Sequence, residues 1–336
     1  MARLADGVLA YRRHPVHRTL EDPPAIWREG NTRVLDFGRT HAAAREKGTR
    51  AVLVVPSLIN RWEVLDLTAE KSLLRAMAAE GLRPYLVDWG TPDGEERRFD
   101  LAAYVARLDR ALAVVARRAR RRPAVMGYCM GGTLAVALAA LRPRRLAGLA
   151  LLAAPWDFHA DKTGHAFLLS TGPLLARVAD ETGELPLDIL QTLFWSLDPW
   201  LAMKKFSRFL GLDQQGEPAR EFVLLEDWLN GGAPLAGPVA RDCLIGWYGD
   251  NLPGTGGWVV DGHAIVPANI KTPSLVMIPS GDRIVPPLSA AALADPARGL
   301  KDATRLDVPL GHIGMVVSSR ARALCWTPLI DWLKAR

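Results

Sequence analysis

Short apolar runs alternate with amphipathic stretches along most of the chain from Thr49 onward. The run AVLVV (51–55) is apolar at every position and ends at Pro56, which is typical of a strand covered on both faces. Further strands are predicted over 84–89 and 146–155 and in segments that begin at Pro273 and Thr304. Helical spacing predicts helices over 68–80, 99–122, 133–143 and 319–334. This alternation predicts an α/β protein with a mainly parallel sheet flanked by helices.

The alternation stops between residues 157 and 269, where the chain is rich in Trp, Phe, Leu and Gly and has helical pieces but no clear strands. We interpret 157–269 as a cap, or lid, inserted into a core made of 49–156 and 270–336. Residues 1–48 are assigned to an N-terminal extension.

The segment GYCMGG (127–132) has the form G-x-C-x-G between a predicted strand and a predicted helix. This is the nucleophile elbow of the α/β-hydrolase fold with cysteine in place of serine. Gly127 and Gly131 are expected where neighbouring backbone leaves no room for a side chain. The following helix N-terminus favours a thiolate, so the pattern predicts Cys129 as the nucleophile. The alternative is that Cys129 is a small buried residue in a glycine-rich turn.

An acyl-transfer site also needs hydrogen-bond donors for the oxyanion that develops on the attacked carbonyl group. The backbone N–H of Met130, directly after the nucleophile, is one expected donor. The loop after AVLVV should supply the other, and Leu58 holds the matching position.

The fold places the acid and the histidine after late strands, in that chain order. Asp282 in PSGDRIVPP and His312 in PLGHIGMV each follow a predicted strand. His312 is predicted to take the thiol proton and Asp282 to orient the imidazole. The alternative is a loop histidine and a turn aspartate without catalytic roles. Surface or structural roles are expected for the other histidines, with His263 in a hairpin: His14, His17, His41, His159, His165 and His263.

Many aromatic residues lie in the predicted cap or at its leading edge. Two interpretations remain open and can coexist: a lid over an apolar acyl tunnel, with a dimer surface beside it, or the cap's own core. The residues concerned are Trp156, Trp195, Trp200, Trp228, Trp247, Trp258, Phe167, Phe194, Phe206 and Phe209.

The amino-acid composition limits the classes of protein to which the chain can belong. Of 336 residues, 49% are hydrophobic and 23% charged, an ordinary globular balance, and the net charge of +6 gives no evidence for nucleic-acid binding. Three scattered cysteines do not suit a disulfide framework or a zinc site, so we expect a reducing cytoplasm and neither metal nor cofactor. Signal-peptide and transmembrane patterns are not found.

Five segments resemble the poly(3-hydroxyalkanoate) synthases. They are VPSLINRWEVLDL (55–67), LVDWGTPD (86–93), GYCMGGTL, GDRIVPP and LGHIGMVV. The second is similar to the form found in the short, two-subunit synthases. The resemblance implies that a hydroxyacyl-CoA acylates Cys129, and that His312 activates both the thiol and the hydroxyl of the incoming unit. CoA would then enter as part of the substrate rather than as a bound cofactor.

The resemblance also has departures. The long N-terminal region of the larger synthases is not seen, and Arg283 stands where many members have histidine. By resemblance we expect a homodimer or a partner synthase subunit, together with association with polymer granules. Three functions are weighed, in descending order: a polymerising acyltransferase, a thioesterase or esterase of the same fold, and a non-catalytic partner.

Overall fold

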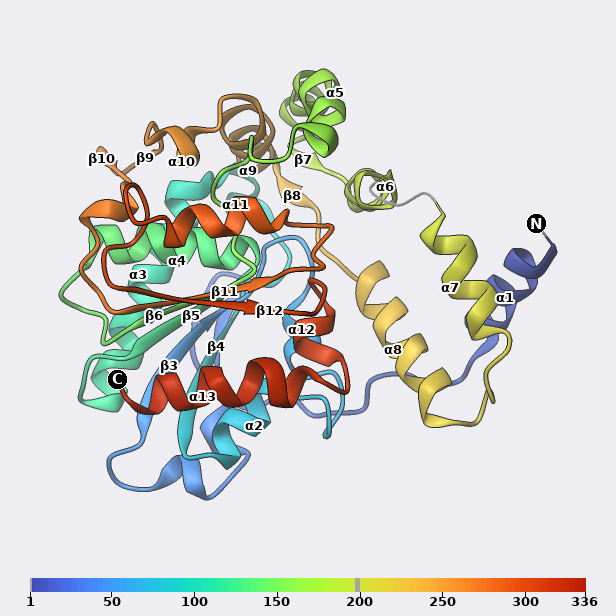
Figure 1. Cartoon of the computed structure of the whole chain (residues 1–336), viewed down its shortest axis with the longest axis horizontal. Helices are drawn as coiled ribbons and strands as arrows, with labels where there is room; N and C mark the ends of the chain where they lie inside the picture. Colours follow the sequence, from blue (N-terminus) through green and yellow to red (C-terminus); the bar gives the residue numbers. More distant parts are fainter. Residues whose placement is uncertain (1, 197–199) are drawn as a thin grey trace.

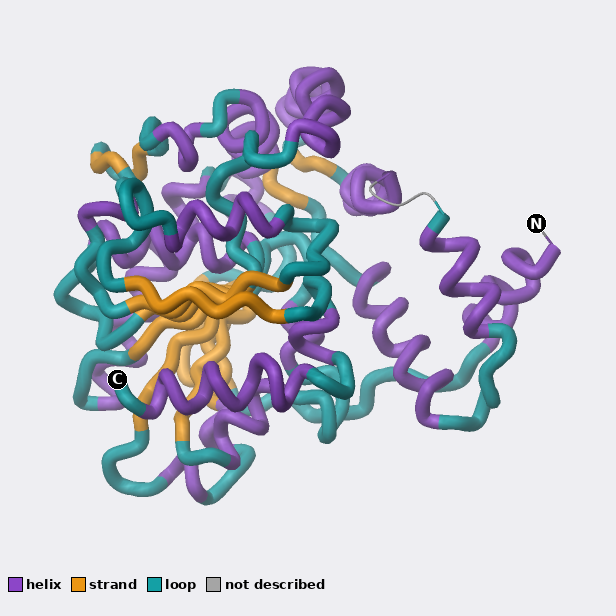
Figure 2. Tube along the Cα trace, viewed as in Figure 1, coloured by secondary structure: helices purple, strands orange, loops and turns teal. Residues whose placement is uncertain are grey.

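An eight-stranded sheet forms the centre of the protein (Figure 1, Figure 2). The computed structural model describes residues 2–196 and 200–336, and of residues 2 and 162–165 the backbone alone. Across the sheet the strands are β1 (Ala25–Glu29), β2 (Thr32–Asp36), β4 (Leu82–Asp88), β3 (Arg50–Val55), β5 (Ala124–Tyr128), β6 (Leu149–Leu152), β11 (Ser274–Pro279) and β12 (Ala303–Val308). All neighbours from β4 to β12 pair in parallel, which confirms the prediction of a mainly parallel sheet.

Two strands of this sheet come from the segment assigned to an N-terminal extension. β1 and β2 form an antiparallel hairpin, and β2 pairs antiparallel with β4 at the edge of the sheet. The sheet therefore starts before residue 49. The sequence does not reveal β1 as a strand, because its residues, AIWRE, are partly exposed and lack the continuous apolar run of a central strand.

Helices cover both faces of the sheet (Figure 1). In β3, Leu53 and Val55 pack on one face while Val52 and Val54 pack on the other, which explains why the run is apolar throughout. The first face holds α3 (Leu101–Ala119), α4 (Met130–Leu141) and α11 (Pro287–Ala291). The second face holds α2 (Leu73–Ala79), α12 (Gly314–Val317) and α13 (Thr327–Lys334).

The helix predicted over 68–80 is shorter in the structure because its start is fixed by a capping side chain. Ser72 accepts a hydrogen bond from the backbone N–H of Arg75, so α2 begins at Leu73. It ends before Gly81, whose φ of +82° suits the glycine there. The predicted C-terminal helix becomes a π-helical turn, η8 (Arg322–Trp326), followed by α13.

Between β6 and β11 the chain is mostly helical. The helices are α5 (Lys162–Thr182), α6 (Leu187–Ser196), α7 (Leu201–Phe209), α8 (Glu217–Asn230), α9 (Gly237–Arg241) and α10 (Leu252–Thr255), with a π-helical turn, η5 (Asp242–Gly249). Two short antiparallel ladders accompany them: β7 (Glu184–Leu185) with β8 (Leu235–Ala236), and β9 (Val259–Val260) with β10 (His263–Ala264). The second ladder confirms the hairpin expected at His263. Across the described ranges, no helix has both the length and the apolar character that crossing a membrane requires.

The first helix, α1 (Ala2–Arg13), lies against α7 at a distance from the sheet (Figure 1). Gly7 makes the close crossing possible, because a Cβ at this position would overlap the backbone carbonyl of Phe206. Tyr11 joins Phe209 and Val223 in a small apolar cluster shared by α1, α7 and α8. The N-terminal helix therefore stabilises two helices of the inserted segment.

Candidate active site

The predicted elbow is a sharp turn between β5 and α4. Cys129 occupies it with φ 55° and ψ −134°, a backbone conformation that is rarely adopted by L-residues. A Cβ on Gly127 would overlap the backbone of Gly132, and one on Gly131 would overlap the carbonyl oxygen of Val55. The expectation that both glycines must lack side chains is therefore confirmed.

Replacing Gly131 with alanine should distort this turn, because the obstructing atoms are backbone atoms that cannot move aside. We expect Gly131→Ala to lower the free energy of unfolding by about 1–3 kcal/mol and to slow alkylation of Cys129. Urea unfolding and iodoacetamide labelling measure the two effects. Gly211→Ala is the matched control, since the nearest atom to its added Cβ lies 3.5 Å away. Equal effects of the two substitutions would contradict this account of the elbow.

Asp282 and His312 come together because their strands are neighbours. β11 and β12 pair in parallel, so the loops that follow them leave the same edge of the sheet. The imidazole Nδ1 of His312 lies 2.6 Å from Oδ2 of Asp282. Oδ1 of the same carboxylate accepts the backbone N–H groups of Ile284 and Val285 at 2.8 and 2.9 Å. These bonds fix which oxygen faces the histidine.

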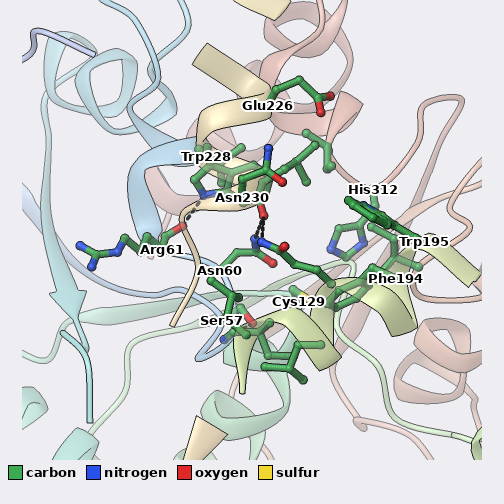
Figure 3. A pocket seen from close by; sticks show the side chains of 18 of the residues that line it. Ser57, Asn60, Arg61, Cys129, Phe194, Trp195, Glu226, Trp228, Asn230 and His312 are labelled. Atoms are coloured by element: carbon green, nitrogen blue, oxygen red, sulfur yellow. Dashed lines mark hydrogen bonds between the residues drawn. The ribbon is translucent and has the colours of Figure 1, made fainter. Parts of the chain in front are cut away.

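The third predicted side chain, Cys129, completes the cluster: it is hydrogen-bonded to His312, and both residues line one cavity (Figure 3). Burial disfavours the charged imidazolium, but the negative charge on Cys129 and the hydrogen bond to Asp282 outweigh burial and raise the pKa of His312 to about 10. The arrangement can hold a thiolate–imidazolium pair, the state from which a cysteine attacks a carbonyl carbon.

Tyr128 supports the histidine from the other side and was not anticipated from the sequence. Its hydroxyl donates to the carbonyl oxygen of His312 at 3.1 Å, and the two rings lie 5.2 Å apart. Burial raises the pKa of Tyr128 well above its ordinary value, so its hydroxyl remains a donor. Its place inside G-x-C-x-G, next to the nucleophile, was the available signal.

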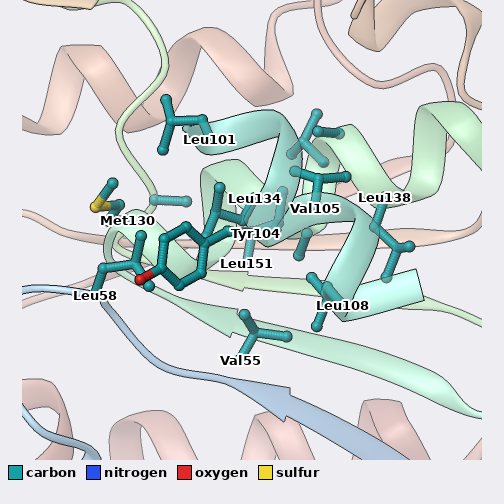
Figure 4. Close-up of a cluster of buried hydrophobic side chains, with 14 of the residues drawn as sticks. Val55, Leu58, Leu101, Tyr104, Val105, Leu108, Met130, Leu134, Leu138 and Leu151 are labelled. Carbon is teal, nitrogen blue, oxygen red and sulfur yellow. The ribbon is translucent and has the colours of Figure 1, made fainter. Parts of the chain in front are cut away.

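The two expected oxyanion donors belong to segments anchored by buried side chains. Met130 is the first residue of α4, where backbone N–H groups have no acceptor within the helix. Leu58 lies in the loop after β3. Figure 4 shows the side chains of both residues in the same buried cluster, beside Tyr104. Burial of these side chains holds both backbone segments near the elbow, and their roles as donors stay a prediction.

The cavity has a volume of about 190 Å³ and lies between the elbow and the helices α6, α7 and α8. Its wall combines aromatic and aliphatic side chains with a few polar groups, among them Asn60 (Figure 3) and Gln191. Lys205 and Glu226 form an ion pair at 2.6 Å in this wall. Burial raises the pKa of Glu226, although Lys205 opposes the shift. No sequence pattern identifies these four residues, because they become neighbours through the packing of three helices and a loop.

The aromatic residues of the inserted segment divide between the two interpretations. Trp247 packs edge-on against Trp258 at 5.3 Å, and both are buried, as a core requires. Phe194, Trp195 and Trp228 line the cavity, as a lid requires. Trp156 belongs to the first group, since it packs on Trp258. Phe206 packs on Tyr11 of α1, Phe209 lies in the small cluster with α1, and Phe167 and Trp200 are exposed.

The other histidines whose side chains the structure describes lie outside the candidate site. Of the histidines whose side chains are described, His312 is the one that lines the cavity. His14 packs on Phe209, and His263 is exposed. The side chain of His165 lies outside the described residues. Among described residues, no cluster of His, Cys, Asp and Glu could hold a metal ion.

Comparisons with known proteins place this geometry in context. No family profile matches the chain. It is 27% identical over 325 residues to "Poly(3-hydroxyalkanoate) polymerase subunit PhaC" of Haloferax mediterranei, covering 93% of this chain and 63% of that protein, less than two thirds of its length. The namesake from Allochromatium vinosum is 30% identical over 293 residues, covering 85% of this chain and 81% of the relative. An α/β-hydrolase-fold protein from Nakamurella multipartita superposes with a TM-score of 0.51 at 15% identity, covering 94% of this chain and 99% of that structure. This likeness confirms the predicted fold.

Proposed function

This chain belongs to the poly(3-hydroxyalkanoate) polymerase family, and on that basis we propose that it is an acyltransferase that polymerises 3-hydroxyacyl-CoA with release of CoA. The observation that carries the proposal is a cysteine on a strained elbow, hydrogen-bonded to a histidine that is itself bonded to a buried aspartate. The relatedness to the Allochromatium protein supplies the substrate class.

In the first half-reaction Cys129 is acylated. His312 takes the thiol proton on Nε2, since Nδ1 is engaged with Asp282. The thiolate attacks the thioester carbonyl, and the oxyanion that forms faces the N–H groups predicted at Met130 and Leu58. Collapse breaks the bond to the CoA sulfur, which leaves with the proton held by His312. The products are an acyl-Cys129 thioester and free CoA.

In the second half-reaction the acyl group moves to an alcohol. His312 takes the proton of a hydroxyl on another hydroxyacyl unit, whose oxygen attacks the acyl-Cys129 carbonyl. An ester bond forms, the bond to Sγ of Cys129 breaks, and the thiol regains its proton. Water in place of the hydroxyl would give free hydroxy acid, which is the hydrolase alternative. The aromatic wall over Cys129 supports polymerisation because it limits access of water to the intermediate.

The relatives are named as polymerase subunits, which supports a further part of the proposal: the chain acts with a partner subunit or a second copy. We further propose that it does so at a polymer granule in the cytoplasm. Large apolar side chains are exposed on the inserted helical segment, in agreement with an apolar partner or surface. They are Phe167, Leu169, Leu174, Trp195, Trp200 and Leu201.

Product analysis with 3-hydroxybutyryl-CoA tests the proposal. We expect CoA release to exceed free 3-hydroxybutyrate by at least about tenfold, with the missing acyl groups recovered as polymer or bound to protein. CoA is measured with a thiol reagent and the free acid by chromatography. Stoichiometric free acid would establish the hydrolase alternative, and no CoA release would favour the non-catalytic one. Because relatives are subunits, the assay is repeated with a partner subunit present.

A further inference from the structure

The end of α8 and the residues after it are joined to the loop that follows β3. Trp228 donates its indole N–H to the carbonyl oxygen of Arg61 at 2.6 Å. Ala233 donates its backbone N–H to the carbonyl oxygen of Ile59 at 3.0 Å. Residues 228–233, here called the strap, therefore bond to both sides of Asn60, in the loop that contains Leu58 (Figure 3).

The bonds converge on a short stretch of backbone close to the nucleophile. Asn60 returns a bond from its side-chain amide to the carbonyl oxygen of Leu229 at 3.5 Å, and Gln191 of α6 donates to the same oxygen at 3.4 Å. Asn60, Gln191 and Cys129 all line the cavity. A shift of the strap would therefore move the loop relative to the elbow.

The strap is fixed from behind by the N-terminal helix. The hydroxyl of Tyr11 in α1 donates to Oδ1 of Asp227 at 2.7 Å, and the Asn230 side chain donates to the same hydroxyl at 3.3 Å. Phe209 and Phe222 stack at 4.4 Å where α7 meets α8. The strap is thus held to α1 through Asn230 and to the loop through Trp228 and Ala233, while the preceding part of α8 packs on α7.

We propose that the strap is a positioning element for the oxyanion site, and that Trp228 is its main positioning residue. By holding the carbonyl groups of Ile59 and Arg61, the strap keeps the Leu58 N–H directed at the carbonyl group bound over Cys129. This inference rests on the proposed acyl-transfer function. Neither Trp228 nor Ala233 has to touch the reacting atoms to act in this way.

Two reactions of Cys129 separate this role from a general structural one. Alkylation by iodoacetamide is a displacement at a saturated carbon, so it requires the thiolate but no oxyanion donor. Acylation by a thioester passes through a tetrahedral oxyanion, and loss of one donor typically costs about 10²–10³ in kcat. A displaced loop should therefore slow acylation and leave alkylation nearly unchanged.

Trp228→Phe keeps a ring in the cavity wall and removes the indole donor. Gly232→Ala is the second variant, because its Cβ would lie 2.8 Å from the carbonyl oxygen of Ile59 and push on the loop directly. Trp332→Phe is the matched control, because the indole N–H of Trp332 in α13 has no hydrogen-bond partner among the described residues and this residue lies outside the cavity wall. The intact chain is used throughout, with far-UV circular dichroism to compare folding.

First-turnover CoA release from saturating 3-hydroxybutyryl-CoA gives the acylation rate, whether polymer or free acid follows. We expect the acylation rate of Trp228→Phe and Gly232→Ala to fall at least tenfold, while their alkylation by iodoacetamide stays within threefold of wild type. Trp332→Phe should be near wild type in both reactions. Acylation unchanged in both variants, or acylation and alkylation reduced together, would overturn the inference. Failure of the proposed function is distinguishable, because it shows in the wild-type chain itself: free hydroxy acid would replace polymer in a hydrolase, and no CoA would be released by a non-catalytic chain.

Discussion

Cys129→Ala should abolish acyl transfer, lowering the rate of CoA release by about 10⁴-fold or more. Removal of Sγ leaves no atom in the elbow that can form the covalent intermediate. The backbone should tolerate the change, because alanine is as strained as cysteine at φ 55° and no side chain grows into the packed turn. The variant is therefore expected to fold with an unchanged melting temperature.

The measurement is CoA release, together with mass spectrometry of the protein after a brief exposure to substrate. Wild-type chain should gain one acyl mass, and Cys129→Ala should gain none. Cys243→Ala and Cys325→Ala are the matched controls, because burial raises the pKa of both thiols and keeps them unreactive. An acyl adduct that persists in Cys129→Ala would assign the nucleophile to another residue.

The sequence was sufficient to predict those features of the fold and of the site that depend on local residue pattern and on chain order. Buried strands such as β3 and β6 can be recognised in the sequence because their residues are apolar on both faces. Gly127, Gly131 and Cys129 identify the elbow because its steric demands allow few residue types. Asp282 and His312 could be chosen because parallel strands bring the loops after β11 and β12 together.

Features created by contacts between distant segments could not be predicted in the same way. The β1–β2 hairpin is an edge structure whose polar positions hide its pairing with β4. The contact of α1 with α7 depends on Gly7, and nothing in the sequence pairs that glycine with Phe206. The strap is held largely by backbone carbonyl and N–H groups, which every residue carries, so it leaves no signature in residue types.

Asp282→Asn should lower the acylation rate by about 10²–10⁴-fold, although it only replaces one carboxylate oxygen with an NH₂ group. The N–H groups of Ile284 and Val285 require an acceptor, so the amide oxygen must take the place of Oδ1. The amide NH₂ then faces Nδ1 of His312 in place of a carboxylate oxygen. An NH₂ group donates, which forces the histidine proton from Nδ1 to Nε2. With Nε2 protonated, His312 cannot accept the proton of Cys129.

The pH profile tests this explanation apart from the loss of rate. Asp282 is one of the groups that raise the pKa of His312 to about 10, so the imidazolium that protonates the departing CoA sulfur should persist up to about that pH in the wild-type chain. Without the carboxylate that pKa falls, and the alkaline limb of the acylation profile should move to lower pH. Asp295→Asn is the matched control, because Asp295 caps a similar turn through Ala297 and Arg298 on the surface. A reduced rate with an unshifted alkaline limb would mean that Asp282 acts by holding its loop, because orientation and charge of the imidazole would then be unaffected.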